Sequence, residues 1–331
     1  MILNFRNVYL ENVSTVCGPY EAKGPLSKNF DKKYIDDLYC KEKSFEKAEI
    51  RLLEDSIKIL LKKTKLTSKD IDLVIAGDLL NQIASSCYGA LNLKSPFLGI
   101  YTACATSIEG MLIGATFIDS GKVNNALISC SSHNMSSEKQ FRNPTEYGSP
   151  KPETATFTAT GGASVLLSNK PSKVRVVNGL IGTIVDLNQK DPFNMGAAMA
   201  CAAADTLYKY LTETNTKASD YDLILTGDLG KYGKEILKDL MLSEYNIDLS
   251  KNYNDCGVLL YNLEEQKEVM AGGSGPVCSA LVNYSTIIKG LMENKYKKVL
   301  LIATGALFSP TMLFQKMNIL SIANLICLEA I

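Results

Sequence analysis

The chain alternates short apolar runs with longer segments in which apolar residues recur every three or four positions. Two segments have helical spacing: residues 44–63, with Ile50, Leu53 and Ile57 on one face, and the alanine-rich residues 194–211. Apolar runs of strand length occur at 73–76, 126–130, 162–168, 255–261 and 299–303. Strands that alternate with helices predict an α/β protein whose mainly parallel sheets are covered by helices on both faces.

One sequence phrase occurs twice along the chain. A polar turn, a strand and a Gly-Asp pair occupy residues 66–80 and again 217–229, so that Asp78 and Asp228 hold matching positions, as do Asp72 and Asp222. A repeat of this length predicts two similar α/β halves, 1–170 and 171–331, in place of a solenoid. We expect Asp78 and Asp228 to cap helices or to bond turn amides.

Residues 97–118 combine three patterns around one cysteine. An apolar run ends at Tyr101, small residues surround Cys104, and apolar residues from Ile108 onward recur at helical spacing. The stretch predicts a buried strand that leads Cys104 to the N-terminus of a buried helix. Unpaired amides and the helix dipole favour an anion there, either a thiolate or a bound carboxylate. The alternative is that Cys104 is a small core residue, since free cysteine is often buried.

Composition removes several classes of function. The 35 basic and 35 acidic side chains cancel, so charge gives no sign of nucleic-acid binding. Nine cysteines without a C-x-x-C pair indicate reduced thiols, and neither a disulfide framework nor a zinc site. The first residues lack a basic region followed by a long apolar stretch, and no apolar run approaches the roughly 18 residues that span a bilayer. We therefore expect neither a signal peptide nor a transmembrane segment.

Several motifs in order carry a resemblance to a known superfamily. The two α/β halves, the cysteine on the first central helix, the glycine-rich turn 272–276 and the run Thr160-Gly-Gly-Ala-Ser-Val-Leu-Leu resemble the thiolase superfamily, which includes the ketoacyl-ACP synthases. Further motifs resemble the stage V sporulation protein AD family within it: residues 140–148, 151–156, 191–200, 255–257 and 305–310. The resemblance covers nearly the whole chain. It implies a thiolase-like fold of duplicated halves in a layered αβαβα arrangement with mostly parallel mixed sheets.

The resemblance also implies a biological role. The family suggests a component of the spore dipicolinic acid transport machinery that works with other membrane proteins of the SpoVA complex. We expect a peripheral location at the forespore or inner spore membrane. Because the superfamily is usually dimeric, we also expect a homodimer.

Catalysis is not expected from the residues present. Condensing enzymes of this fold use a histidine and an asparagine, or a second histidine, from the C-terminal half, where they assist acid–base and oxyanion chemistry. This chain has one histidine, His133, which lies in the first half, and it carries Gly227-Asp228-Leu229 and Gly273-Ser274-Gly275 at the corresponding turns. The alternative is an acyltransferase or ketoacyl-synthase-like enzyme that uses Cys104 as its nucleophile.

The candidate ligand site is a pocket for the dicarboxylate dipicolinate. We expect the amides of Cys104, Ala105 and Thr106 to meet a carboxylate at the helix N-terminus. The glycine-rich turn would bring the backbone of Ser274 and Gly275 close to the ligand.

Three side chains are further candidates for this site. His133 ends the strand after the cysteine helix, although it could equally be a satisfied structural histidine. Arg142 is the candidate for a bidentate carboxylate contact, or else pairs with Glu138 or Glu146. Glu146 could meet calcium that arrives with dipicolinate. No resident cofactor or metal is expected.

Overall fold

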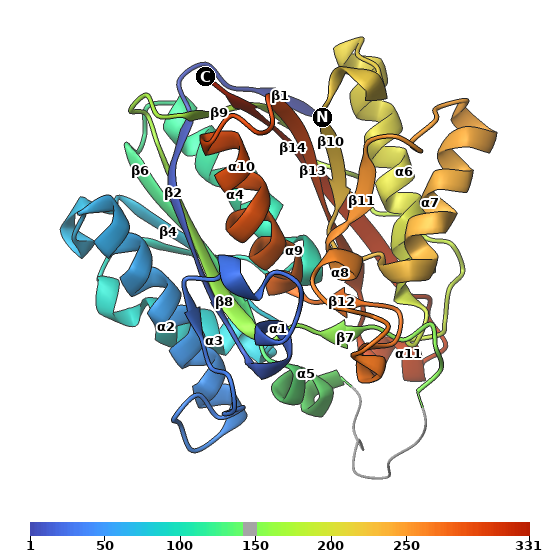
Figure 1. The fold of residues 1–331 in the computed structure, drawn as a ribbon, viewed down its shortest axis with the longest axis horizontal. Helices are drawn as coiled ribbons and strands as arrows, with labels where there is room; N and C mark the ends of the chain where they lie inside the picture. Colours follow the sequence, from blue (N-terminus) through green and yellow to red (C-terminus); the bar gives the residue numbers. More distant parts are fainter. Residues whose placement is uncertain (142–150) are drawn as a thin grey trace.

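The computed structural model describes residues 1–141 and 151–331. Their long strands form one mixed sheet in the order β11-β10-β13-β14-β9-β2-β8-β6-β4-β5 (Figure 1). The first-half strands are β2 (Tyr9–Cys17), β4 (Leu73–Gly77), β5 (Phe97–Gly99), β6 (Asn125–Ser132) and β8 (Gly161–Ser168). The second-half strands are β9 (Val174–Leu180), β10 (Leu223–Thr226), β11 (Tyr253–Asp255), β13 (Lys298–Leu307) and β14 (Leu320–Ala330). Short strands are β1 (Ile2–Asn4), β3 (Lys32–Lys33), β7 (Phe157–Thr158) and β12 (Gly273–Ser274).

The strand order is the same in both halves when it is read outward from the centre. The sequence β2-β8-β6-β4-β5 matches β9-β14-β13-β10-β11, and the two sets meet where Tyr9 pairs with Arg175 and Leu10 with Val174. In each half the three outer strands are parallel and the inner pairs are antiparallel. This arrangement confirms the predicted duplicated α/β fold.

The helices form the remaining layers. Figure 1 shows α4 (Thr106–Asp119), α9 (Pro276–Val282) and α10 (Ile288–Met292) between the two halves of the sheet. The outer layers are α2 (Phe45–Thr64) with α3 (Ala84–Ala90) on one side and α6 (Met195–Thr214) with α7 (Gly230–Tyr245) on the other. Short helices are α1 (Pro19–Ala22), α5 (Asn134–Phe141), α8 (Cys256–Leu259) and α11 (Pro310–Phe314). The central core joins both halves, since Met111 of α4 shares it with Ile128 and Leu301.

The repeated aspartates that precede β4 and β10 make the same contact in each half. Asp72 Oδ2 accepts the amides of Asn124 and Asn125 at 2.7 and 2.9 Å. Asp222 Oδ2 accepts the amide of Lys298 at 3.0 Å and that of its neighbour Lys297. The matched contacts support the duplication that the sequence phrase predicts.

Two local predictions are wrong. The strand before Cys104, β5, is not buried: it is the last strand of the sheet, and Phe97 and Leu98 are 39% and 37% exposed. The run 255–261 is not a strand, because β11 ends at Asp255 and α8 begins at Cys256. The Asp255 side chain accepts the amide of Val258 and so caps that helix.

Candidate functional site

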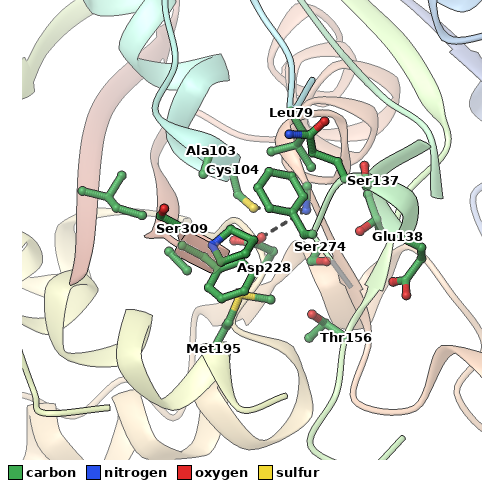
Figure 2. A pocket seen from close by; sticks show the side chains of 18 of the residues that line it. Leu79, Ala103, Cys104, Ser137, Glu138, Thr156, Met195, Asp228, Ser274 and Ser309 are labelled. Atoms are coloured by element: carbon green, nitrogen blue, oxygen red, sulfur yellow. Dashed lines mark hydrogen bonds between the residues drawn. The ribbon is translucent and has the colours of Figure 1, made fainter. Parts of the chain in front are cut away.

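A cavity of about 580 Å³ lies beside Cys104. Its wall combines Ala103 and Cys104 before α4, Ser137 and Glu138 of α5, Met195 at the start of α6, Asp228 after β10, and Ser274 of β12 (Figure 2). Residues 306–311, from the end of β13 into α11, also line the cavity. The volume lies in the range of small-molecule sites, about 300–1,000 Å³.

Tight backbone turns bring the two halves together at Cys104. Ala103 has a positive φ of 50°, which turns the chain into α4 just before the cysteine. Gly275 has a φ of 96°, a conformation that L side chains rarely adopt, and its N–H donates to Cys104 Sγ at 3.2 Å. A Cβ on Gly305 would lie 2.6 Å from the Thr102 carbonyl oxygen, so this position also requires glycine. The structure therefore confirms the predicted corner and glycine-rich turn.

The Cys104 sulfur is held as a thiol. Burial raises its pKa well above the ordinary value, and the neighbouring Asp228 carboxyl raises it further. The hydrogen bond from the Gly275 amide lowers the pKa of the thiol, but by less than burial raises it. Because the thiolate is the nucleophilic form of cysteine, the thiolate alternative of the sequence analysis is disfavoured.

Asp228 is the site residue that the sequence analysis missed. Its Oδ1 accepts the Thr304 hydroxyl at 2.7 Å, and its Oδ2 lies 3.3 Å from the Gly275 amide. Figure 2 shows its carboxyl group pointing toward the Cys104 sulfur. Asp78 and Asp228 both accept turn amides, as predicted: Leu80 and Ser86 donate to Asp78, and Gly275 donates to Asp228. The position of Asp228 in the cavity wall was not predicted. A signal was present, since Asp228 follows β10 at the turn where a condensing enzyme of this fold would carry its histidine.

His133 is not part of the cavity wall, contrary to the prediction that it binds the ligand. It is fully buried, its Nε2 lies 2.8 Å from the Leu38 carbonyl oxygen, and its Nδ1 accepts the Met135 amide at 3.2 Å. The ring also contacts Phe45. Burial lowers its pKa. Both ring nitrogens have hydrogen-bond partners, so His133 fits the alternative prediction, a structural histidine.

The other predicted residues divide into three groups. Cys104, Ser274 and Gly275 are brought together in the wall. Ala105 and Thr106 are fully buried and do not line the cavity. Their amides donate to the carbonyls of Thr102 and Ala103, so the prediction that these amides meet a carboxylate is wrong. Arg142 and Glu146 lie outside the described residues.

The charge of the wall differs from that expected for a dianion site. Glu138 forms an ion pair with Lys151 at 2.8 Å, and Asp228 is a second carboxyl group. No lysine or arginine lines the cavity within residues 1–141 and 151–331. In the same part of the chain, no group of three or more histidine, cysteine or acidic side chains could hold a metal ion. No helix described here is long and apolar enough to cross a membrane.

Comparisons with known proteins agree with this architecture. Residues 2–329 match the family model of "Stage V sporulation protein AD (SpoVAD)". Stage V sporulation protein AD of Bacillus subtilis (strain 168) is 46% identical over 322 residues, which cover 97% of this chain and 94% of the relative.

Solved structures support the fold alone. The cerulenin-bound OleA structure from Xanthomonas campestris has a TM-score of 0.65 at 13% identity, over 99% of this chain and 100% of OleA. The 3-oxoacyl-[acyl-carrier-protein] synthase III of Aquifex aeolicus VF5 has a TM-score of 0.59 at 13% identity, over 97% of this chain and 99% of the synthase. The sequence matches span nearly the whole length, so this thiolase-like chain belongs to the stage V sporulation protein AD family, a family of sporulation proteins.

Proposed function

We propose that this chain is a non-catalytic binding protein that captures dipicolinate, free or as its calcium chelate, in the cavity beside Cys104. The observation that carries the proposal is the contact between Cys104 and Asp228. A condensing enzyme would need a base and oxyanion donors around its nucleophile. Here the neighbour of the protonated Cys104 thiol is the carboxyl group of Asp228. The single histidine, His133, is bonded to the Leu38 carbonyl away from the cavity.

The size and charge of the cavity agree with a small chelated ligand. Dipicolinate carries two carboxylates, whereas the described wall offers Asp228 and Glu138 and no cationic side chain. Calcium bound to the ligand would supply the missing positive charge, because hard cations prefer carboxylate oxygen. The proposal includes a peripheral location at the forespore or inner spore membrane, where SpoVA membrane proteins would receive the ligand for transport into the spore.

Calorimetric titration of dipicolinate, with and without calcium, tests this proposal. We expect saturable binding that Met195→Trp abolishes, because the larger side chain fills the cavity. Met135→Trp is the matched control, since Met135 is 39% exposed and does not line the cavity. In sporulating cells the first variant should lower spore dipicolinate and the second should not. Absence of binding up to millimolar ligand would overturn the proposal. An acyl adduct that forms on Cys104 with acyl-CoA and is then released would favour the acyltransferase alternative.

We further propose that two copies of the chain pair through β5. This strand has one neighbour, β4, among the described strands, and its exposed apolar side chains continue to Tyr101, which is 52% exposed. The unpaired backbone N–H and C=O groups of an open sheet edge can pair with a strand of another chain. A second copy related by a two-fold axis would supply such a strand, its own β5.

Sedimentation of variants tests the dimer. Leu98→Lys is expected to give a monomer, because it introduces a charge into the paired edge. Phe314→Lys should leave the mass unchanged, although Phe314 is 79% exposed, since it lies on α11 and not on this edge. A monomeric native chain at micromolar concentration, or a dimeric Leu98→Lys variant, contradicts pairing through β5.

A further inference from the structure

Two buried carboxyl groups that interact with one another lie at the cavity wall and behind it. Asp228 lines the cavity, and Asp255 lies in the fold beside the turn that carries Asp228. Both side chains are buried, at 1% and 0% exposure. Two neighbouring carboxyl groups in a buried site do not ionise independently, so the hydrogen bonds around each one decide where the negative charge resides.

Asp255 receives the larger set of donors. Its Oδ2 accepts the Thr226 hydroxyl at 2.8 Å and the Leu229 amide at 2.9 Å. Its Oδ1 accepts the amides of Gly230 and Val258 at 3.0 and 3.3 Å. Four donors to two oxygens stabilise a carboxylate, so Asp255 is the better place for the charge.

Asp228 receives fewer donors and faces no basic group among the described residues. The Thr304 hydroxyl donates to Oδ1, while the Gly275 amide that approaches Oδ2 also donates to Cys104 Sγ. The Cys104 thiol is a third donor and a weak one. The titratable groups that face it are the thiols of Cys104, Cys256 and Cys278 and the Asp255 carboxyl.

The thiols are all protonated at neutral pH, because burial raises the pKa of each one well above its ordinary value. Burial and the neighbouring Asp255 carboxyl favour the neutral acid at Asp228, whereas the Cys104 thiol, as a weak donor, opposes them only in part. Burial raises the pKa of Asp228 to about 7 and that of Asp255 to about 6. Asp228 is thus the weaker acid of the two, as the hydrogen bonds around them indicate.

We propose that Asp228 acts as a carboxylic acid that donates a hydrogen bond to a carboxylate of the bound ligand. This inference rests on the proposed function and assigns the specificity for a carboxylate to one side chain. An acid–carboxylate hydrogen bond is short and strong. It gives an anionic ligand a donor on the cavity wall at a point where a carboxylate at Asp228 would repel it. The proton remains shared between Asp228 and the ligand, and no covalent bond forms.

The pH dependence of dipicolinate binding without added calcium tests this role. Both ligand carboxylates are ionised between pH 6 and 8.5, since ordinary carboxyl groups titrate near 4. The wild-type affinity should fall by roughly tenfold or more over this interval, because the fraction of protein with a protonated Asp228 falls. Asp228→Asn keeps a donor and no titratable group, so its affinity should be flat across the interval. Asp228→Leu should bind roughly tenfold or more weakly at pH 6.

Controls separate this inference from the proposed function. Asp222→Asn changes an aspartate at the other end of β10 and should keep the wild-type pH profile. Wild-type binding that is equally tight at pH 6 and 8.5, or an Asn variant that retains the wild-type slope, overturns the role of Asp228 and leaves dipicolinate binding standing. Failure of the wild type to bind dipicolinate at any pH overturns both proposals. If Asp228→Leu does not fold, the Asn profile alone decides.

Discussion

Asp255→Ala is expected to lower the free energy of unfolding by at least about 3 kcal/mol. The carboxylate accepts four hydrogen bonds, from the Thr226 hydroxyl and from the amides of Leu229, Gly230 and Val258. A buried donor left without a partner costs about 1–3 kcal/mol, and loss of the helix cap on α8 adds about 0.5–2 kcal/mol. Water that enters the space left by the side chain offsets part of the sum.

Urea denaturation measures the effect, and Asp222→Ala is the matched control. Asp222 also accepts two backbone amides, but it is exposed, so water replaces it and the cost should stay within about 1 kcal/mol. The Asp255 variant should also bind ligand more weakly, because its side chain holds the two amides that follow Asp228. Equal losses in the two variants would contradict the assigned importance of Asp255.

The fold could be predicted from sequence because its signals are local and repeated. Amphipathic spacing set the position of α2 to within a residue or two, and the matched phrases around Asp72 and Asp222 predicted the duplication. The error at 255–261 was also local in origin. A polar residue before an apolar run marks a helix start when its side chain reaches the amide three residues on, as Asp255 does to Val258.

The site could be predicted only in part, because tertiary packing decides which side chains face the cavity. Cys104 and Gly275 were predicted, since a strand-to-helix corner and a glycine-rich turn constrain their own backbones. His133 was wrong because the segment around Leu38, which is remote in sequence, takes its ring nitrogen. Asp228 was missed because its neighbours, Thr304 and Gly275, come from two other segments of the second half.

The repeated aspartates of the two halves differ in their relation to the cavity. Asp72 and Asp222 bond turn amides in the same way, as purely structural partners do. Asp78 keeps that kind of role, with its oxygens on the amides of Leu80 and Ser86. Asp228 also accepts a turn amide, that of Gly275, but it lines the cavity as well, whereas Asp78 does not. The asymmetry of an otherwise duplicated fold therefore coincides with the proposed ligand site.

Another buried acid, Glu49, supports the cavity wall through α5. Glu49 of α2 is fully buried, and its carboxyl group accepts the hydroxyls of Ser131 at 3.2 Å and Ser136 at 2.7 Å. Ser136 belongs to α5, whose next residues, Ser137 and Glu138, line the cavity. Burial, together with the nearby Asp78 carboxyl, raises the pKa of Glu49 to about 8. The protonation of Glu49 therefore bears on both stability and the position of α5.

The stability of the fold is expected to fall as the pH rises from about 5 to 8. Between the ordinary pKa of 4.5 and the folded value of about 8, the folded chain holds a proton on Glu49 that the unfolded chain releases. The contribution of the protonated Glu49 to the free energy of unfolding is therefore complete below pH 4.5, the ordinary pKa. It is lost progressively as the pH rises to the folded pKa of about 8. Glu21 adds to the same slope, since burial raises its pKa to about 7.

Glu49→Gln tests this expectation because it keeps the shape of the side chain and removes the charge. At pH 9 the variant should be more stable than wild type by about 2 kcal/mol or more, and at pH 5 the two should agree closely. Glu46→Gln on the same helix is the control, since Glu46 pairs with Lys139 and its pKa is lowered, so its profile should follow wild type across this interval. Urea unfolding at both pH values gives the comparison. A Glu49→Gln profile parallel to wild type would show that Glu49 stays ionised in the fold and that α5 is held by a carboxylate.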